Sequence, residues 1–181
     1  MAKKIILLLL CLTFALPLVS CGEDVDVNEE LTYDLNGITL VLPRYMRRSY
    51  SEDWDFYFDN LSMAMYGKCI DRDVLADMEL PATTTRKEYA DLFIENRKLD
   101  KTKIELTEDA GRATTTFRYI YQPEDGSAAQ SCQVVLIGDT GNLWFVEISA
   151  DSETFEEHVS MFNVWCSKLT LTERKPEDEP K

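Results

Sequence analysis

Apolar residues form three kinds of pattern along the chain: one unbroken run, several alternating runs, and stripes at helical spacing. The unbroken run follows Lys3 and Lys4 and covers 15 residues, from Ile5 to Val19. A membrane-spanning helix needs about 20 apolar residues. A basic start, a short apolar centre and a small residue at Ser20 are typical of a secretory signal peptide. We therefore expect residues 1–20 to be a cleaved signal that leaves no spanning helix.

Alternating apolar and polar residues predict strands in the rest of the chain. Asn36-Gly37 is a two-residue type I′ turn signal, because both positions require positive φ, and it predicts a hairpin over residues 31–42. Trp144, Val146 and Ile148 share one face of another strand. Beyond the hairpin, strands are expected over residues 54–59, 61–69, 104–108, 112–122, 130–138 and 143–150.

Apolar residues at helical spacing predict two main helices. Thr85 and Glu88 form a capping box, which places a helix over about residues 86–98. A second helix begins near Ser152 and a short one is expected over residues 71–78. The stripe of the second helix consists of Phe155, Val159, Phe162, Cys166 and Leu169. The order of elements predicts an α+β domain with a mainly antiparallel sheet over residues 32–172.

The charge of the chain is strongly acidic. It has 33 Asp and Glu against 19 Lys and Arg, a formal net charge of −14. This composition disfavours binding to nucleic acid or to an anionic lipid surface by charge. The acidic segment 21–31 is expected to be a solvated tether, and the polar segment 173–181, with two prolines, a disordered tail.

The end of the signal segment carries the most specific chemistry in the sequence. Leu18-Val19-Ser20-Cys21 resembles the lipobox of bacterial lipoproteins. The resemblance implies cleavage before Cys21, a thioether-linked diacylglyceryl group on its sulfur, and fatty acylation, for example by palmitate. The membrane is then a partner through this lipid, and the protein is extracytoplasmic on the cell membrane or the outer membrane. The acids after Cys21 also resemble export signals of surface lipoproteins. The alternative is an ordinary secretory signal with an unmodified cysteine.

Three cysteines remain in the expected domain: Cys69, Cys132 and Cys166. Cys69 and Cys132 fall on apolar faces of predicted strands, so a disulfide between them is one interpretation. The other is three buried free thiols that pack as small hydrophobic groups. The three cysteines and the single His158 do not have the spacing of a metal-site motif. We expect no metal and no cofactor.

The stretch from Tyr45 to Asp59 mixes aromatic, basic and acidic residues, which suits a contact with a protein or carbohydrate. The alternative is a half-buried strand with its aromatic residues in the core and its acids in solvent. The candidate partner-binding residues are Tyr45, Arg47, Arg48, Trp54 and Tyr57.

Catalytic residues are not evident in the sequence. His158 has no nucleophile or orienting acid at a recognisable spacing. A second hypothesis is an envelope hydrolase that uses Asp53 and Asp55 with Glu147, which requires two carboxylates about 5–9 Å apart in a cleft.

Several apolar motifs resemble the PsbP-like superfamily over residues 33–172. They are Asn36-Gly37-Ile38-Thr39-Leu40-Val41-Leu42-Pro43, Glu88-Tyr89-Ala90, Phe117-Arg118-Tyr119, Leu143-Trp144-Phe145-Val146, and Phe155 with Phe162-Asn163-Val164-Trp165-Cys166-Ser167. The resemblance implies an α-β-α sandwich around an antiparallel sheet and a role as a non-catalytic binding or assembly factor. It carries over no functional residue. The leading hypothesis is therefore a lipid-anchored binding module whose partner is an envelope protein or another envelope component.

Overall fold

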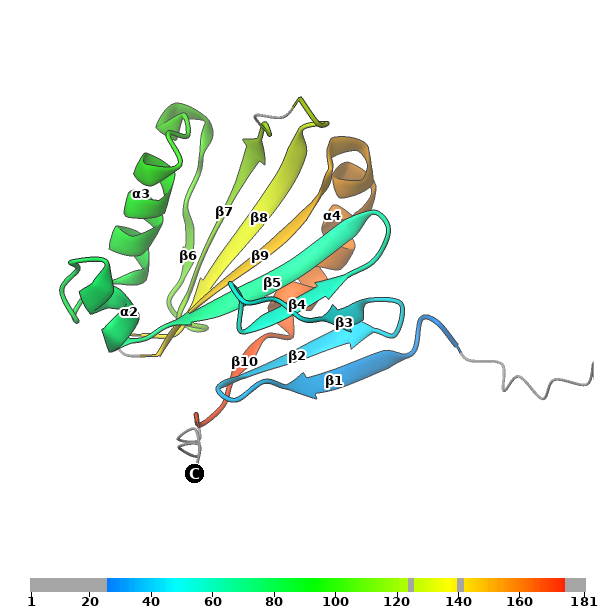
Figure 1. The fold of residues 1–181 in the computed structure, drawn as a ribbon, viewed down its shortest axis with the longest axis horizontal. Helices are drawn as coiled ribbons and strands as arrows, with labels where there is room; N and C mark the ends of the chain where they lie inside the picture. The colour runs from blue at the N-terminus through cyan, green and yellow to red at the C-terminus, as the bar shows by residue number, and fades with distance from the viewer. Residues whose placement is uncertain (1–25, 124–125, 140–141, 175–181) are drawn as a thin grey trace, which may run out of the picture.

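The computed structural model describes residues 26–123, 126–139 and 142–174. The signal segment, Cys21, the first part of the acidic segment and residues 175–181 lie outside these ranges. Within them, strands form two antiparallel sheets and helices cover the larger sheet (Figure 1). This arrangement confirms the expected α+β class with a mainly antiparallel sheet.

The larger sheet has seven strands in the order β3-β4-β5-β9-β8-β7-β6, and the smaller has three in the order β1-β2-β10. The strands are β1 (Glu30–Asp34), β2 (Ile38–Pro43), β3 (Arg47–Ser49), β4 (Phe56–Asp59), β5 (Met63–Ile70), β6 (Thr107–Asp109), β7 (Thr114–Tyr121), β8 (Gln130–Ile137), β9 (Leu143–Asp151) and β10 (Thr170–Leu171). The helices are α2 (Arg72–Asp77), α3 (Arg86–Asn96), the 3-10 turn η1 (Lys101–Lys103) and α4 (Ser152–Ser167).

Helix α4 and the small sheet cover one face of the larger sheet, which we call the α4 face (Figure 1). The core on this face joins Leu40 of β2, Met65 of β5, Val146 of β9 and Phe162 of α4, all fully buried. The predicted stripe of α4 is oriented as expected, because Phe155, Phe162, Cys166 and Leu169 are buried and Val159 packs partly buried against the same core. The sequence therefore correctly placed the apolar side of the last helix.

Helices α2 and α3 lie on the opposite face, the α3 face (Figure 1). Leu75 of α2, with Ala90 and Ile94 of α3, packs on Phe117 of β7 and Leu136 of β8. Strands β8 and β9 are buried on both faces, so they read as nearly continuous apolar runs rather than alternating ones. Two separate cores result, one on each side of the sheet.

Local sequence signals explain two of the chain reversals. Asn36 and Gly37 have φ values of 52° and 124°, as the type I′ turn requires, and they join β1 to β2. Helix α3 begins at the predicted capping box and ends at Asn96, before Lys98 enters the left-handed region with φ 52°. The predicted end at residue 98 was therefore slightly too late.

Three further expectations need correction. Cys69 packs in the core of the α4 face and Cys132 in that of the α3 face, so the sheet separates them and the disulfide interpretation is wrong. Leu61 is fully exposed, and β5 begins only at Met63. Strand β1 begins at Glu30, inside the segment expected as a tether, because its backbone pairs with Pro43 of β2.

The three described cysteines, Cys69, Cys132 and Cys166, are buried free thiols, as the second interpretation stated. Among the described residues, no helix has the length and apolar character needed to cross a bilayer.

Candidate functional site

An open cavity of about 490 Å³ lies on the α3 face, between α2, α3 and the adjoining part of the sheet. We call it the aromatic groove. Its lining is mainly apolar with three charged residues, which is typical of ligand and partner sites. The lining residues are Asp53, Trp54, Lys68, Ile70, Val74, Asp77, Met78, Tyr89, Phe93 and Phe145.

Trp54 forms one wall of the aromatic groove. It lies in the segment before β4, and its half-buried ring packs against two residues of the sheet. The ring centroids of Trp54 and Tyr66 are 4.5 Å apart, and those of Trp54 and Phe145 are 6.0 Å apart with nearly parallel planes. Tyr57 also stacks on Tyr66, with ring centroids 5.7 Å apart and an interplanar angle of 5°. Such contacts hold the indole in place without burying it completely.

Helix α3 forms the opposite wall. The phenyl ring of Phe93 lies 5.2 Å from that of Phe145, and Tyr89 one turn earlier also lines the groove. The capping box fixes the start of this helix: the Glu88 N–H donates to Thr85 Oγ1 over 3.2 Å, and the Thr85 N–H donates to Glu88 Oε2 over 2.8 Å. The wall therefore rests on a local signal that the sequence displays.

Charged side chains complete the lining. Lys68 pairs in register with Phe145, and Asp53 and Asp77 approach from the segment before β4 and from α2. Our sequence interpretation did not include Lys68 in a site. The signal for Lys68 was its place among the less buried positions of a strand that alternates from Met63 to Cys69, which indicates a side chain open to water on that face.

A buried carboxyl group lies beside the groove. Glu147 is only 2% exposed, and the Tyr66 hydroxyl donates to its Oε1 over 2.5 Å. The Tyr119 hydroxyl donates to both carboxyl oxygens at 3.0 Å. Burial raises the pKa of Glu147 above its ordinary value, although the two tyrosine hydrogen bonds oppose that rise. Burial and the neighbouring Glu147 likewise raise the pKa of Tyr66 and of Tyr119.

The five candidate residues do not form one surface. Trp54 and Tyr57 lie on the α3 face, and Arg47 is placed on the same side by its register opposite Asp59. Arg48 lies on the other side of β3, where it lines a different cavity.

Tyr45 also lies on the α4 face. Its hydroxyl donates to the sulfur of Met161 over 3.1 Å, and its ring lies 6.5 Å from that of Trp165. The structure therefore brings Trp54 and Tyr57 together and separates Tyr45 and Arg48 from them. Arg48 is separated from Arg47 because consecutive residues of β3 point to opposite faces.

The acids of the hydrolase hypothesis are also separated. Asp53 lines the aromatic groove, whereas Asp55 lines the cavity that contains Arg48. Glu147 lines neither, because its carboxyl group is enclosed by two tyrosines. His158 contacts the backbone of its own helix, with Nδ1 2.9 Å from the Thr154 carbonyl oxygen. This geometry does not support a catalytic set built on these residues.

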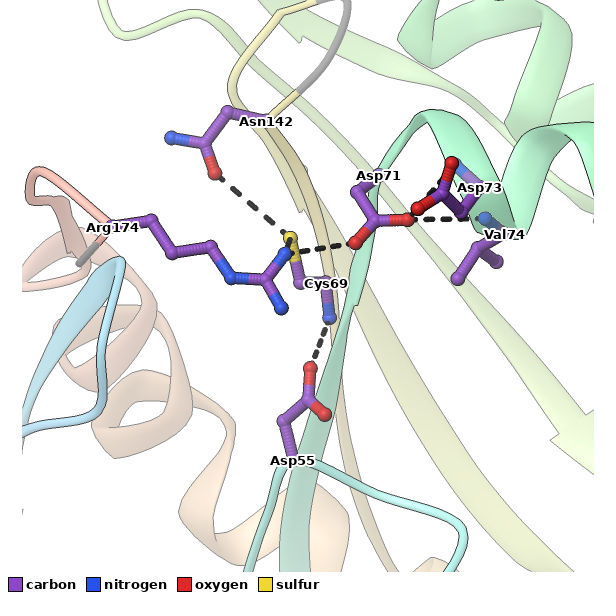
Figure 2. Close-up of polar contacts among 7 residues, drawn as sticks. All are labelled: Asp55, Cys69, Asp71, Asp73, Val74, Asn142 and Arg174. Carbon is purple, nitrogen blue, oxygen red and sulfur yellow. Dashed lines mark hydrogen bonds and ion pairs between the residues drawn. The ribbon is translucent and has the colours of Figure 1, made fainter. Parts of the chain in front are cut away.

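A second polar cluster surrounds Cys69 on the α4 face (Figure 2). Arg174 Nη1 donates to Asp71 Oδ2 over 2.9 Å and to the Cys69 sulfur over 3.4 Å. The Cys69 N–H donates to Asp55 Oδ2 over 2.7 Å, and its thiol to Asn142 Oδ1 over 3.9 Å. Burial raises the pKa of the Cys69 thiol to about 11, so it is held in the unreactive neutral form. Arg174 lies within the segment expected as a tail, so the folded chain extends further than expected.

No group of His, Cys, Asp and Glu in the described part of the chain is arranged to hold a metal ion.

Comparison with known proteins identifies the fold. No protein-family model and no curated protein sequence matches the chain. The chain is similar to the solution structure of PsbP from the cyanobacterium Synechocystis sp. PCC 6803, at 15% identity over 86% of this chain and 99% of that one, with a TM-score of 0.50. It is also similar to the Ran-binding protein Mog1p of Saccharomyces cerevisiae, at 10% identity over 80% of this chain and 96% of that one, with a TM-score of 0.51.

A third structure is LpqN, involved in cell envelope biogenesis of Mycobacterium tuberculosis, at 13% identity over 80% of this chain and 91% of that one, with a TM-score of 0.41. At these identities the likeness concerns the fold alone. The chain therefore has a PsbP-like fold: a mainly antiparallel sheet with a few helices packed on it.

Proposed function

We propose that this protein is a lipid-anchored, extracytoplasmic and non-catalytic binding module. It holds an apolar side chain of a partner protein in the aromatic groove. The observation that carries this proposal is the groove itself, where Trp54, Phe93 and Phe145 surround a cavity of about 490 Å³. Aromatic residues on a concave surface are the usual anchors of protein interfaces, because they bury a large area with little loss of side-chain entropy.

The chemistry of the partner follows from the charges around the groove. Asp53 and Asp77 contribute two carboxylates against the single amine of Lys68. The whole chain carries a net charge of −14, which attracts basic partners over a distance. The preferred partner is therefore a protein segment with an aromatic or aliphatic side chain flanked by Lys or Arg.

The fold is compatible with this role. The similar yeast protein Mog1p is described as Ran-binding, so at least one protein with this architecture binds another protein. The lipobox-like sequence at Cys21 supports a position at the outer side of a bacterial membrane, where the partner would be an envelope protein.

Cross-linking in intact cells, followed by mass spectrometry, tests the proposal when it is combined with two matched variants. Met78 lines the groove and is 38% exposed, so Met78→Lys adds a positive charge there with little effect on the fold. Leu61 is fully exposed and does not line the groove, so Leu61→Lys is the control. We expect one partner to be recovered with the wild-type protein and with Leu61→Lys, and to be lost with Met78→Lys.

The purified partner should then bind at least about tenfold more weakly to Met78→Lys than to Leu61→Lys. Equal recovery and equal affinity with both variants would show that the groove is not the binding site.

A further inference from the structure

A second cavity, of about 270 Å³, lies on the α4 face and is separate from the aromatic groove. We call it the arginine cavity. It is bordered by the β1–β2 turn, by β3, and by the end of the described chain at residue 174. Its lining residues are Asp34, Leu35, Asn36, Arg48, Asp55, Trp144 and Arg174.

Trp144 lines this cavity, and its buried indole N–H is an unsatisfied donor. Trp144 is 99% buried, and its Nε1 has no hydrogen-bond partner among the described residues. The nitrogen edge of the ring faces the turn: a Cβ placed on Gly37 would lie 3.4 Å from Nε1 and 3.6 Å from Cβ of Arg174. A buried donor without a partner is unfavourable, so an acceptor bound here would be stabilised.

A second buried polar atom without a partner belongs to Thr172, which pairs with the same turn. Thr172 donates its backbone N–H to the Gly37 carbonyl over 3.0 Å, but its buried Oγ1 has no partner in the described structure. Two unsatisfied polar atoms therefore belong to residues that contact the same glycine.

Two guanidinium groups add donors to the cavity. Arg174 uses only Nη1 for Asp71 and Cys69, and Figure 2 shows its other terminal nitrogen directed away from both. The side chain of Arg48 makes no hydrogen bond or ion pair with another residue of the described chain. Guanidinium groups bind carboxylates through paired N–H donors.

Two carboxylates balance these cations. Asp55 accepts from the Cys69 N–H through Oδ2 only, and the side chain of Asp34 has no hydrogen-bond partner in the described part of the protein. A simple anion would meet these two acids, and a simple cation would meet the two arginines and the indole N–H. A ligand with a carboxylate and an ammonium group attached to the same carbon atom satisfies both sets.

We infer that the arginine cavity binds a small zwitterion, a free α-amino acid. Its carboxylate accepts hydrogen bonds from Trp144 Nε1–H, Arg48 and Arg174. Its ammonium group donates to Asp34 and Asp55. The site is independent of the aromatic groove and of the partner proposed for it.

Two-dimensional NMR of the ¹⁵N-labelled protein tests this inference directly. The chain has three tryptophans, so three indole N–H signals are expected, and Trp54→Phe and Trp165→Phe assign the Trp144 signal by elimination. The titrants are a panel of free α-amino acids, with acetate and methylamine as ligands that carry one charge each. We expect at least one amino acid to shift the Trp144 signal saturably, at concentrations at which acetate and methylamine do not.

Arg47 and Arg48 provide a matched pair, because they are adjacent and exposed on β3 but point to opposite faces. Arg48→Ala should weaken amino-acid binding by about tenfold or more, and Arg47→Ala should leave it unchanged. The inference is wrong if no amino acid shifts the signal saturably up to about 10 mM, which would mean that only water occupies the cavity. It is also wrong if acetate binds as well as the amino acids, or if both arginine variants weaken binding equally.

Discussion

Tyr66 donates its hydroxyl hydrogen to the buried carboxyl group of Glu147 over 2.5 Å. The two residues face each other in register on β5 and β9, and Tyr119 of β7 donates to the same carboxyl group. Three strands are thus joined by a polar contact inside an otherwise apolar core. A buried acid in such a place is costly when it ionises, so it makes stability depend on pH.

Glu147→Gln is expected to remove part of this pH dependence. Because burial raises the pKa of folded Glu147, the folded state holds a proton that the unfolded state loses above the ordinary glutamate pKa of 4.5. The stability that Glu147 contributes is therefore complete below pH 4.5 and is lost as the pH rises toward the raised pKa. Chemical denaturation at a series of pH values should show the wild type losing stability relative to Glu147→Gln over this range, by at most about 1.4 kcal/mol per pH unit.

Glu156→Gln is the control for this experiment, because Glu156 is exposed on α4. A constant difference between wild type and Glu147→Gln across the pH range would show that Glu147 ionises normally in the folded protein.

Gly67→Ala should destabilise the protein strongly. A Cβ at this position of β5 would lie 2.5 Å from Cζ of Phe56 and 2.7 Å from the Phe145 carbonyl oxygen, so β5 and β9 would have to move apart. Overpacking of this kind costs about 1–3 kcal/mol, which thermal or chemical denaturation measures readily. Gly111→Ala is the matched control, since its Cβ would meet only the Asp109 carboxylate, at 3.3 Å. Equal stability of the two variants would contradict the packing described for Gly67.

The three buried cysteines should react slowly with a thiol reagent in the native protein; they are Cys69, Cys132 and Cys166. After denaturation they should react rapidly, and no reductant should be needed to release them. Burial protects all three and raises the pKa of Cys69 and Cys166 to about 11, so few thiolates form at neutral pH. Ser62→Cys, at an exposed position, supplies a fast-reacting thiol for comparison. A disulfide-linked peptide containing Cys69 and Cys132 would contradict the placement of these residues on opposite faces.

Cys21→Ser should abolish lipid attachment and leave the signal segment uncleaved. The proposed thioether requires the Cys21 sulfur, and the lipobox resemblance implies cleavage directly before this residue. Two or more acyl chains hold a protein on a membrane almost permanently. Fractionation, immunoblotting and metabolic labelling with a fatty acid measure the change. Cys11→Ser, within the signal segment, is the control and should be processed normally. Unchanged labelling and processing of Cys21→Ser would refute the anchor.

The elements with short-range signals were predictable from the sequence. Asn36-Gly37 specified the hairpin turn, Thr85 with Glu88 specified the start of α3, and the stripe from Phe155 specified the buried side of α4. Each depends on residues a few positions apart. The fold class followed from the order of these elements.

The candidate site could be predicted only in part. Trp54 and Tyr57 were recognised from their aromatic and acidic surroundings, but the groove also needs Phe93 of α3 and Phe145 of β9, which only tertiary packing brings together. The sequence also does not reveal that Arg48 and Arg47 point to opposite faces of the sheet. Strand β3 has only three residues, which is too short to show an alternating pattern. Long-range register is set by the whole sheet rather than by any one segment.

Photo-cross-linking from the groove tests the proposed function most directly. A photoreactive amino acid placed at residue 78 lies in the aromatic groove, and one placed at residue 61 lies on an exposed loop outside it. In intact cells we expect one discrete adduct with an envelope protein from position 78 and none from position 61. Trp54→Ala should abolish this adduct. Tyr50→Ala should not, because the Tyr50 side chain, four residues earlier in the chain, is 88% exposed. Identical adducts from both positions, or an adduct that persists in Trp54→Ala, would contradict the assignment of the groove as the binding site.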